Sequence, residues 1–198
     1  MKEDTTGQSE NTSFGQSVAI FLYDVAYTLI ALIVLLVLVF RVVVVSGTSM
    51  NMTLLDGDYL LLLSNTLYLN PKQGDIVVIS MESFHNGDAI VKRIIATEGQ
   101  TVDIDFEKGI VYVDGVALEE PYIHTPTTTS GGTQFPLTVE EGCVFVLGDN
   151  RGISQDSRYP SIGQIDTREI LGKAIFLIFP GTNYDQKDRE FSRIGVFE

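Results

Sequence analysis

Residues that could carry out chemistry stand in a few short segments of the sequence. Ser49 lies in VSGTSMNMTL, residues 45–54, and Lys92 lies in IVKRIIATEGQTV, residues 90–102. A serine hydroxyl is a weak nucleophile and needs an adjacent base. A lysine can be that base only as the free amine, and burial in an apolar strand lowers its pKa toward that form. Taken singly, both residues have ordinary interpretations: most serines are structural or solvated, and Lys92 can be exposed while Arg93 forms a salt bridge.

Two further segments complete the set. QGDIVVIS, residues 73–80, is by itself a turn that enters a strand, and VLGDNRGISQDSRYPSIGQI, residues 146–165, is a dense polar cluster after an apolar strand. In isolation the second is compatible with a calcium loop or a plain turn. In this order the four segments resemble the conserved boxes of type I signal peptidases: S-G-x-S-M-x-P-T-L, G-D-I-V-V, K-R and G-D-N-R-x-x-S-x-D-S-R. The resemblance extends from Val18 to about Pro180.

The resemblance implies a role for each matching residue. Ser49 would be the nucleophile, Lys92 the general base, and Ser154 the hydroxyl that orients the lysine amine. The other matches would support the site: Asp156 and Arg158 as an ion pair, Asp149 as a brace, Met50 packed beside the dyad, and Gly47 where some members have a serine that helps the oxyanion hole. With glycine there, the hole would rely on backbone N–H groups, including that of Ser49. A neutral lysine suffices as base, so neither a metal nor an organic cofactor is expected.

The family also implies a substrate and a place of action. Its members remove N-terminal signal peptides from exported preproteins after small, Ala-x-Ala-like residues, outside the cytoplasm. The expected partners are therefore signal peptides, the lipid bilayer and the secretion machinery. The expected fold is mainly β, an antiparallel signal-peptidase-like catalytic domain on one N-terminal transmembrane helix.

The sequence departs from the family pattern at several positions. Met52 replaces the proline of the serine box, and Glu98-Gly99 replaces the Pro-Gly pair that usually follows the K-R box. These changes leave Ser49 and Lys92 in place, but they favour a specialised paralogue, for example one dedicated to pilin precursors. The alternative is a catalytically weak, membrane-anchored assembly or chaperone-like factor with the same fold. A self-cleaving repressor-type Ser/Lys protease would carry a helix-turn-helix upstream, where this chain has an apolar segment.

Composition excludes several other classes. The net charge of -13 argues against a nucleic-acid partner, because phosphates require a basic surface. The single cysteine, Cys143, excludes an internal disulfide and is expected to be a small buried apolar residue. The two histidines, His85 and His124, have no partner at zinc-ligand spacing, so no metal site is expected.

An apolar run near the N-terminus predicts a membrane anchor. Residues 18–40, VAIFLYDVAYTLIALIVLLVLVF, are interrupted only by Asp24 and exceed the roughly 20 residues that a bilayer core requires. A cleaved signal peptide would have a basic start, a shorter apolar run and an Ala-x-Ala-like exit, which this segment lacks. Residues 1–17 are polar and are expected to form a disordered cytoplasmic tail. Lys2 and Arg41 give the positive-inside rule almost no preference, so the orientation, with the C-terminal domain outside, follows only from the resemblance.

Beyond the anchor, residues 41–198 are expected to form one extracytoplasmic β catalytic domain. Short runs rich in Val, Ile and aromatic residues alternate with Gly, Asp, Asn or Pro, which is typical of antiparallel strands. Residues 101–120 predict successive hairpins around a Lys-Gly turn and an Asp-Gly turn. Residues 125–136, TPTTTSGGTQFP, predict a loop, and the order of the tail from residue 181 is left open.

Overall fold

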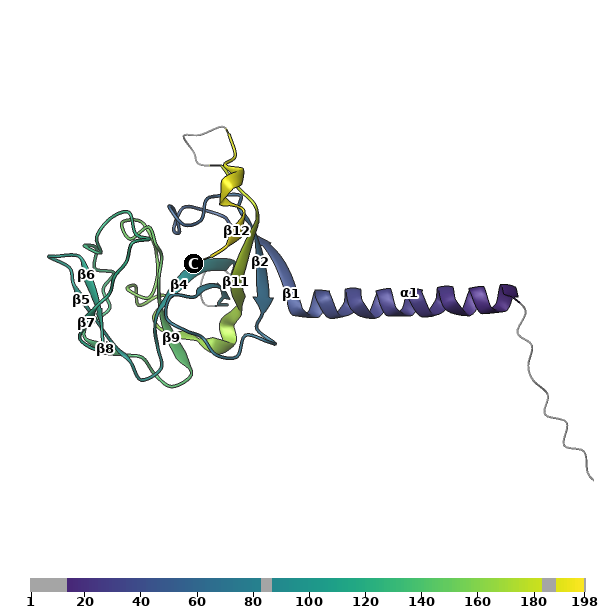
Figure 1. The fold of residues 1–198 in the computed structure, drawn as a ribbon. Coiled ribbons are helices and arrows are strands. Elements are labelled where there is room, and N and C mark those ends of the chain that lie inside the picture. The colour runs from purple at the N-terminus through teal and green to yellow at the C-terminus, as the bar shows by residue number, and fades with distance from the viewer. Residues whose placement is uncertain (1–13, 83–86, 183–187, 198) are drawn as a thin grey trace, which may run out of the picture. The chain divides into compact units, whose positions relative to one another are not determined.

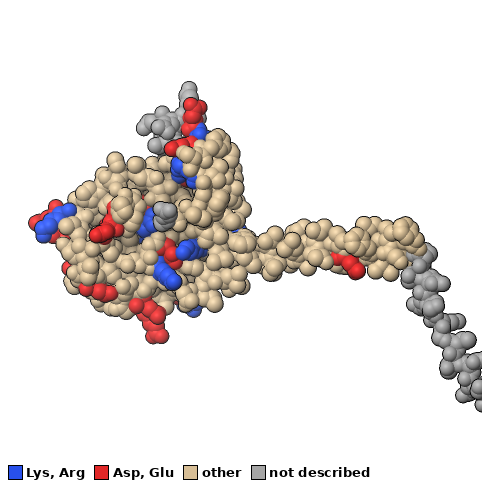
Figure 2. Space-filling view, in the orientation of Figure 1, with Lys and Arg blue, Asp and Glu red and all other residues tan. Residues whose placement is uncertain are grey.

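The computed structural model describes residues 14–82, 87–182 and 188–197. The chain divides into two compact units, one ending at Leu38 and the other starting at Val39. The first contains α1 (Phe14–Val39), whose length and composition suffice to cross a membrane. None of its residues is buried within the structure, and the face of the helix seen in Figure 2 carries one charged side chain, an acidic one. Such a helix needs an apolar environment.

The boundaries of this helix differ from the predicted ones. It begins at Phe14, so residues 14–17 are helical where a disordered tail was expected, while residues 1–13 lie outside the described part of the chain. At its other end, Phe40 starts a strand instead of finishing the helix. The expectation that residues 18–40 span a membrane stays a prediction.

The second unit consists of antiparallel β-sheets, as the sequence predicts (Figure 1). Its strands are β1 (Phe40–Val44), β2 (Tyr59–Ser64), β3 (Ile76–Ser80), β4 (Ala89–Thr97), β5 (Thr101–Asp105), β6 (Ile110–Val113), β7 (Val116–Ala117), β8 (Leu137–Thr138), β9 (Cys143–Leu147), β10 (Ile165–Asp166), β11 (Ile170–Phe179) and β12 (Gly195–Val196). Short 3-10 turns cover Thr167–Glu169 and Phe191–Arg193.

The strands form a large sheet and a small one. The large sheet has the order β1-β2-β11-β3-β4-β9-β10, and β12 pairs with β11; the small one has the order β7-β6-β5-β8. The predicted hairpins are present, since β5 pairs with β6 and β6 with β7. Asp114 and Gly115 both have positive φ at the second turn, which is the conformation that an Asp-Gly hairpin turn adopts. Residues 125–136 form a loop, as expected.

Strands β3 and β4 lie in the middle of the large sheet and are covered on both faces. On β3, Ile76 and Val78 belong to one apolar cluster, whereas Val77 and Ile79 belong to another. The neighbouring β4 buries both Lys92 and Arg93, so the ordinary interpretation with an exposed Lys92 is wrong. At these two positions β4 is buried, so neither charge lies on a solvent-exposed face of the sheet.

Candidate active site

The loop between β1 and β2 brings Ser49 to the side chain of Lys92 on β4. A hydrogen bond of 2.8 Å joins Nζ of Lys92 to Oγ of Ser49, and Nζ also donates to the carbonyl oxygen of Val91 at 3.0 Å. Lys92 is only 3% exposed. Two residues 43 positions apart thus form the contact that a serine nucleophile and its base require.

Burial determines the proton affinity of this lysine. Removal from water lowers the pKa of Lys92 from 10.5 to about 8, because the charged ammonium loses its hydration. The carboxylates of Asp156 and Asp149 oppose this change, and the guanidinium of Arg158 adds to it. The amine is consequently far more often neutral near physiological pH than an exposed lysine would be.

Tight turns hold the serine loop in place. The N–H groups of Thr53 and Leu54 donate to the Met50 carbonyl at 3.0 and 2.8 Å. Met50 and Leu54 are buried in the same apolar cluster, so the residue after Ser49 anchors the loop in the core. Gly47, which precedes Ser49 by two residues, has a φ of 91° and donates its N–H to Oδ1 of Asp56 at 2.8 Å.

The two departures from the family pattern have local structural counterparts. Met52 has a φ of 86°, which a proline cannot adopt because its ring fixes φ near -65°. The loop after Ser49 therefore follows a path that excludes the family residue. Glu98 accepts a hydrogen bond from the N–H of Gly142 at 2.8 Å, and Gly99 has a φ of 77°, so the turn still uses its glycine.

Asp149 braces the loop through a partner that the sequence did not predict. Its carboxylate accepts two hydrogen bonds from Arg93, from Nε at 2.9 Å and from Nη2 at 2.7 Å, and a third from Oγ1 of Thr53 at 2.5 Å. Arg93 neighbours Lys92 on β4, and Thr53 lies four residues after Ser49. The buried carboxylate thus links the strand that carries the lysine to the loop that carries the serine.

Asn150 of the Gly-Asp-Asn-Arg segment also forms hydrogen bonds to the serine loop. The N–H of Asn150 donates to the Ser49 carbonyl at 2.9 Å, and its side-chain amide donates to the Thr48 carbonyl at 3.1 Å. At Gly148 a Cβ atom would lie 2.6 Å from the Ser49 carbonyl oxygen and 2.1 Å from Oγ of Ser154. Only glycine fits between these two groups, a constraint that the spacing of residues in the sequence does not reveal.

Asp156 and Arg158 form the ion pair that the resemblance implies, and both are fully buried. Nε and Nη2 of Arg158 donate to the two carboxylate oxygens at 2.8 and 2.9 Å. The expected hydrogen bond from Ser154 to Lys92, however, is not formed among the described residues. The Ser154 hydroxyl instead points to the carbonyl of Gln155 at 3.5 Å, which is too long for a strong hydrogen bond, and it is packed against Gly148.

Arg151 and Glu120 form another buried ion pair, which the sequence does not predict. Arg151 is 1% exposed and binds Glu120 through both terminal nitrogens, at 2.5 and 3.1 Å, and Thr127 at 2.6 Å. Its Nε donates to the Gly148 carbonyl at 3.0 Å. These bonds connect the segment between β7 and β8, which contains Glu120 and Thr127, to the Gly-Asp-Asn-Arg segment. The two partners of Arg151 are 31 and 24 positions away, and no local pattern marks them.

An open cavity of about 280 Å³ borders the Ser49–Lys92 pair. Its lining residues are Ser46, Gly47, Thr48, Ser49, Ile90, Lys92, Ile153 and Gln155. Ile153 is largely exposed beside the serine, so the wall is partly apolar. Within the described ranges, no group of three or more His, Cys, Asp or Glu side chains could hold a metal ion.

Comparison with known proteins identifies the family. The family described as signal peptidase, peptidase S26, matches residues 18–179. The chain belongs to this signal peptidase family. It is 35% identical to the probable signal peptidase I-1 of Synechocystis sp., over 82% of this chain and 85% of the relative. It is 32% identical to signal peptidase I of Bacillus licheniformis, over 91% and 96% of the two chains.

A solved structure of a signal peptidase I is also similar to this chain. The protein from Enterococcus faecalis V583 is 32% identical, with a TM-score of 0.43 over 52% of this chain and 96% of that one. Members of the S26 family are peptidases. The hydrogen-bonded pair of Ser49 and Lys92 therefore lies in a chain of a peptidase family.

Proposed function

We propose that this member of the family cuts signal peptides from exported preproteins with Ser49 as nucleophile and Lys92 as general base. The observation that supports this assignment most directly is the 2.8 Å hydrogen bond between Nζ and Oγ in a site where Lys92 is 3% exposed. The relatives named above are signal peptidases I, and the residues that match the family boxes converge on this pair.

The neutral amine of Lys92 accepts the proton of the Ser49 hydroxyl as Oγ attacks the carbonyl carbon of the scissile bond. The Oγ–C bond forms, and a tetrahedral oxyanion results. The ammonium then returns the proton to the leaving nitrogen, the C–N bond breaks, and the signal peptide stays on Ser49 as an ester. A water molecule, deprotonated by the same amine, hydrolyses this ester. The N–H of Ser49 is our candidate donor to the oxyanion.

The cavity beside the pair has a partly apolar wall. It is about 280 Å³ and open, with Ile90 and Ile153 on its wall, so a short apolar side chain fills the apolar part better than a charged one. An extended substrate segment can pair with strand edges next to it. We propose cleavage after small residues, as the resemblance to the family implies.

The apolar helix α1 would hold the enzyme at the membrane. We propose an N-in, C-out arrangement, in which the β domain and the substrate's cleavage site are both outside the cytoplasm. Anchoring replaces a search in three dimensions by a local one, because the apolar segment of a signal peptide occupies the same bilayer. The secretion machinery, which delivers the substrates, is the expected partner.

The test is cleavage of a preprotein by detergent-solubilised full-length protein, with Ser49→Ala as the matched control. We expect one cut after a small residue at the end of the signal peptide, and none by the variant. Equal cleavage by both would refute the assignment of Ser49. Binding without cleavage by the wild type would instead identify the alternative, an assembly factor with the peptidase fold. A narrow choice among several preproteins would mark the specialised paralogue suggested by Met52 and Glu98.

A further inference from the structure

The C-terminal segment, residues 188–197, is attached to the unit that carries the active site at several points. Its strand β12 pairs with Phe176 and Leu177 of β11. Phe197 packs against the apolar cluster that contains Met50 and Leu54 of the serine loop. Arg189 donates to the carbonyl of Pro180 at 2.6 Å. We call this segment the C-terminal strap.

The strongest attachment of the strap is Arg193. Its two terminal nitrogens donate to the carboxylate of Asp58 at 3.0 and 2.7 Å, and Nη2 also donates to the Thr53 carbonyl at 3.2 Å. Asp58 is 0% exposed. Among the described residues, Arg193 is the only cation within ion-pair distance of this buried carboxylate. A buried charge requires such a partner.

Asp58 in turn closes the base of the loop that carries Ser49. Its carbonyl accepts from the N–H of Val45 at 2.8 Å, and its carboxylate accepts from the N–H of Leu55 at 2.8 Å. Gly57 donates back to the Val45 carbonyl at 2.9 Å. The two ends of the loop of residues 46–57 are therefore joined by hydrogen bonds of Val45 with Gly57 and Asp58, and Arg193 neutralises the charge of Asp58.

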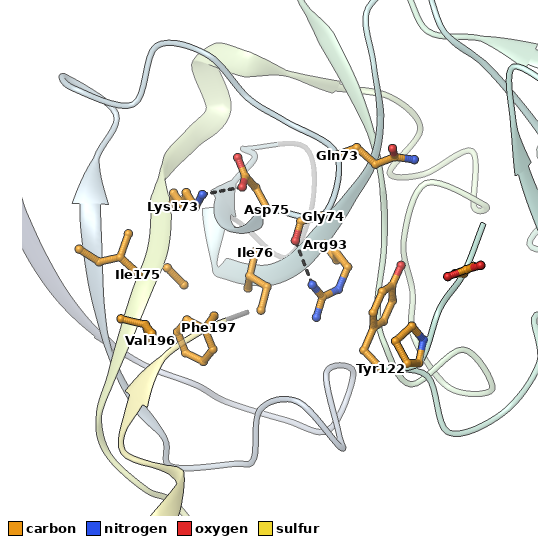
Figure 3. Close-up of a pocket in the computed structure, with 13 residues that line it drawn as sticks. Gln73, Gly74, Asp75, Ile76, Arg93, Tyr122, Lys173, Ile175, Val196 and Phe197 are labelled. Atoms are coloured by element: carbon orange, nitrogen blue, oxygen red, sulfur yellow. Dashed lines mark hydrogen bonds and ion pairs between the residues drawn. The ribbon is translucent and has the colours of Figure 1, made fainter. Parts of the chain in front are cut away.

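Thr53 continues this connection to the catalytic pair. Arg193 holds its carbonyl, while its hydroxyl donates to Asp149, which binds Arg93 beside Lys92. Figure 3 shows a separate cavity of about 630 Å³, with Val196 and Phe197 of the strap on one side and Arg93 of β4 and Tyr122 on the other. Strap, serine loop and lysine strand thus form one contiguous set of contacts.

We propose that Arg193 is a positioning residue of the peptidase: through Asp58 and Thr53, it holds the Ser49 loop in the conformation that reaches Lys92. The inference about catalysis rests on the proposed function. Arg193 touches neither Ser49 nor Lys92. It acts by restricting the motion of the loop that carries Ser49.

The experiment compares full-length, detergent-solubilised wild type with three variants. Arg193→Met removes the guanidinium, and Arg193→Lys keeps a cation for Asp58 without the paired donors. Arg189→Met is the matched control, because it removes the same charge from the same strap, and among the described residues Arg189 contacts Pro180 and Phe179 but neither Asp58 nor Thr53. Two quantities are measured: hydrogen–deuterium exchange of peptides covering residues 46–58, and single-turnover cleavage per active site, titrated by the burst of acyl-enzyme.

In Arg193→Met we expect exchange of the 46–58 peptides to be faster by about tenfold or more. The rate constant per active site should fall about 10- to 100-fold with KM nearly unchanged, because a loop displaced by about 1 Å misaligns the attack. Arg193→Lys should recover part of the slow exchange and part of the rate constant per active site. Arg189→Met should match the wild type in both measurements. A merely structural role would lower the number of active sites and leave the rate per site unchanged.

Unchanged exchange in Arg193→Met, or equal acceleration in Arg189→Met, would overturn the proposal. If Arg193→Met does not fold, the same two outcomes are read from Arg193→Lys. A wild type that cleaves nothing would contradict the proposed function, while the exchange measurement would still decide whether Arg193 restrains the loop.

Discussion

If Lys92 is the general base, its protonation should make the activity depend on pH. Only the neutral amine can take the proton from Ser49, and burial lowers the pKa of that amine to about 8. The cleavage rate should therefore rise as the pH increases through about 8 and then level off.

The size of the effect follows from the two pKa values. At pH 7, an amine with a pKa of about 8 is neutral in roughly one molecule of ten. One with the ordinary value of 10.5 would be neutral in about one of three thousand. Burial thus raises the competent fraction about 300-fold, equivalent to about 3 kcal/mol of differential interaction.

The assay is single-turnover kcat/KM for a signal-peptide substrate without titratable groups near its cleavage site, measured from pH 6 to 10.5. Because kcat/KM reports the free enzyme, its midpoint is that of Lys92 before substrate binds. A rate that is flat from pH 6 to 9 would refute the general-base reasoning. A midpoint at 10 or above would contradict a pKa of Lys92 lowered by burial.

Three further predictions concern support, stability and topology. Asp156→Ala and Arg158→Ala should each reduce the rate about 10- to 100-fold without abolishing it, because they displace the site rather than remove a reacting group; in protein shown to be folded, a loss as complete as that of Ser49→Ala would give them a direct role. Lys92→Met should raise the free energy of unfolding at pH 7 by up to about 3 kcal/mol. The unfolded lysine binds its proton more tightly than the folded one, so this gain is full below pH 8 and should shrink as the pH approaches 10.5; a gain that is constant with pH, in urea titrations, would contradict it. In intact protoplasts, added protease should digest the β domain, and protection until the membrane is breached would reverse the proposed topology.

The strands and the apolar helix were predictable because each has a local signature. The runs that became β3, β9 and β11 are rich in β-branched or aromatic residues, the run that became β2 is mostly leucine, and all are bounded by turn residues. The two-residue β12 is too short for any periodicity, and it exists only because β11 offers it an edge. A tail of uncertain order was all that the sequence could indicate there.

The site was predictable in its residues but not in its connections. Ser49 and Lys92 followed from the family boxes, whereas the pairing of Asp149 with Arg93 depends on the register of β3, β4 and β9. In that register both cations of β4 are buried, whereas the sequence left open that Lys92 is exposed. The direction of the Ser154 hydroxyl could not be predicted either, because it depends on how closely Ser154 packs against Gly148 in the folded chain.

Substitution of Lys92 by arginine tests the central claim most directly. Arginine keeps the charge and most of the length of the side chain, but it does not deprotonate in proteins. If Lys92 is the general base, Lys92→Arg should be as inactive as Lys92→Ala in single-turnover cleavage at every pH from 7 to 10. Substantial activity in Lys92→Arg, with Lys92→Ala inactive, would mean that the cation only stabilises negative charge and would contradict the general-base role.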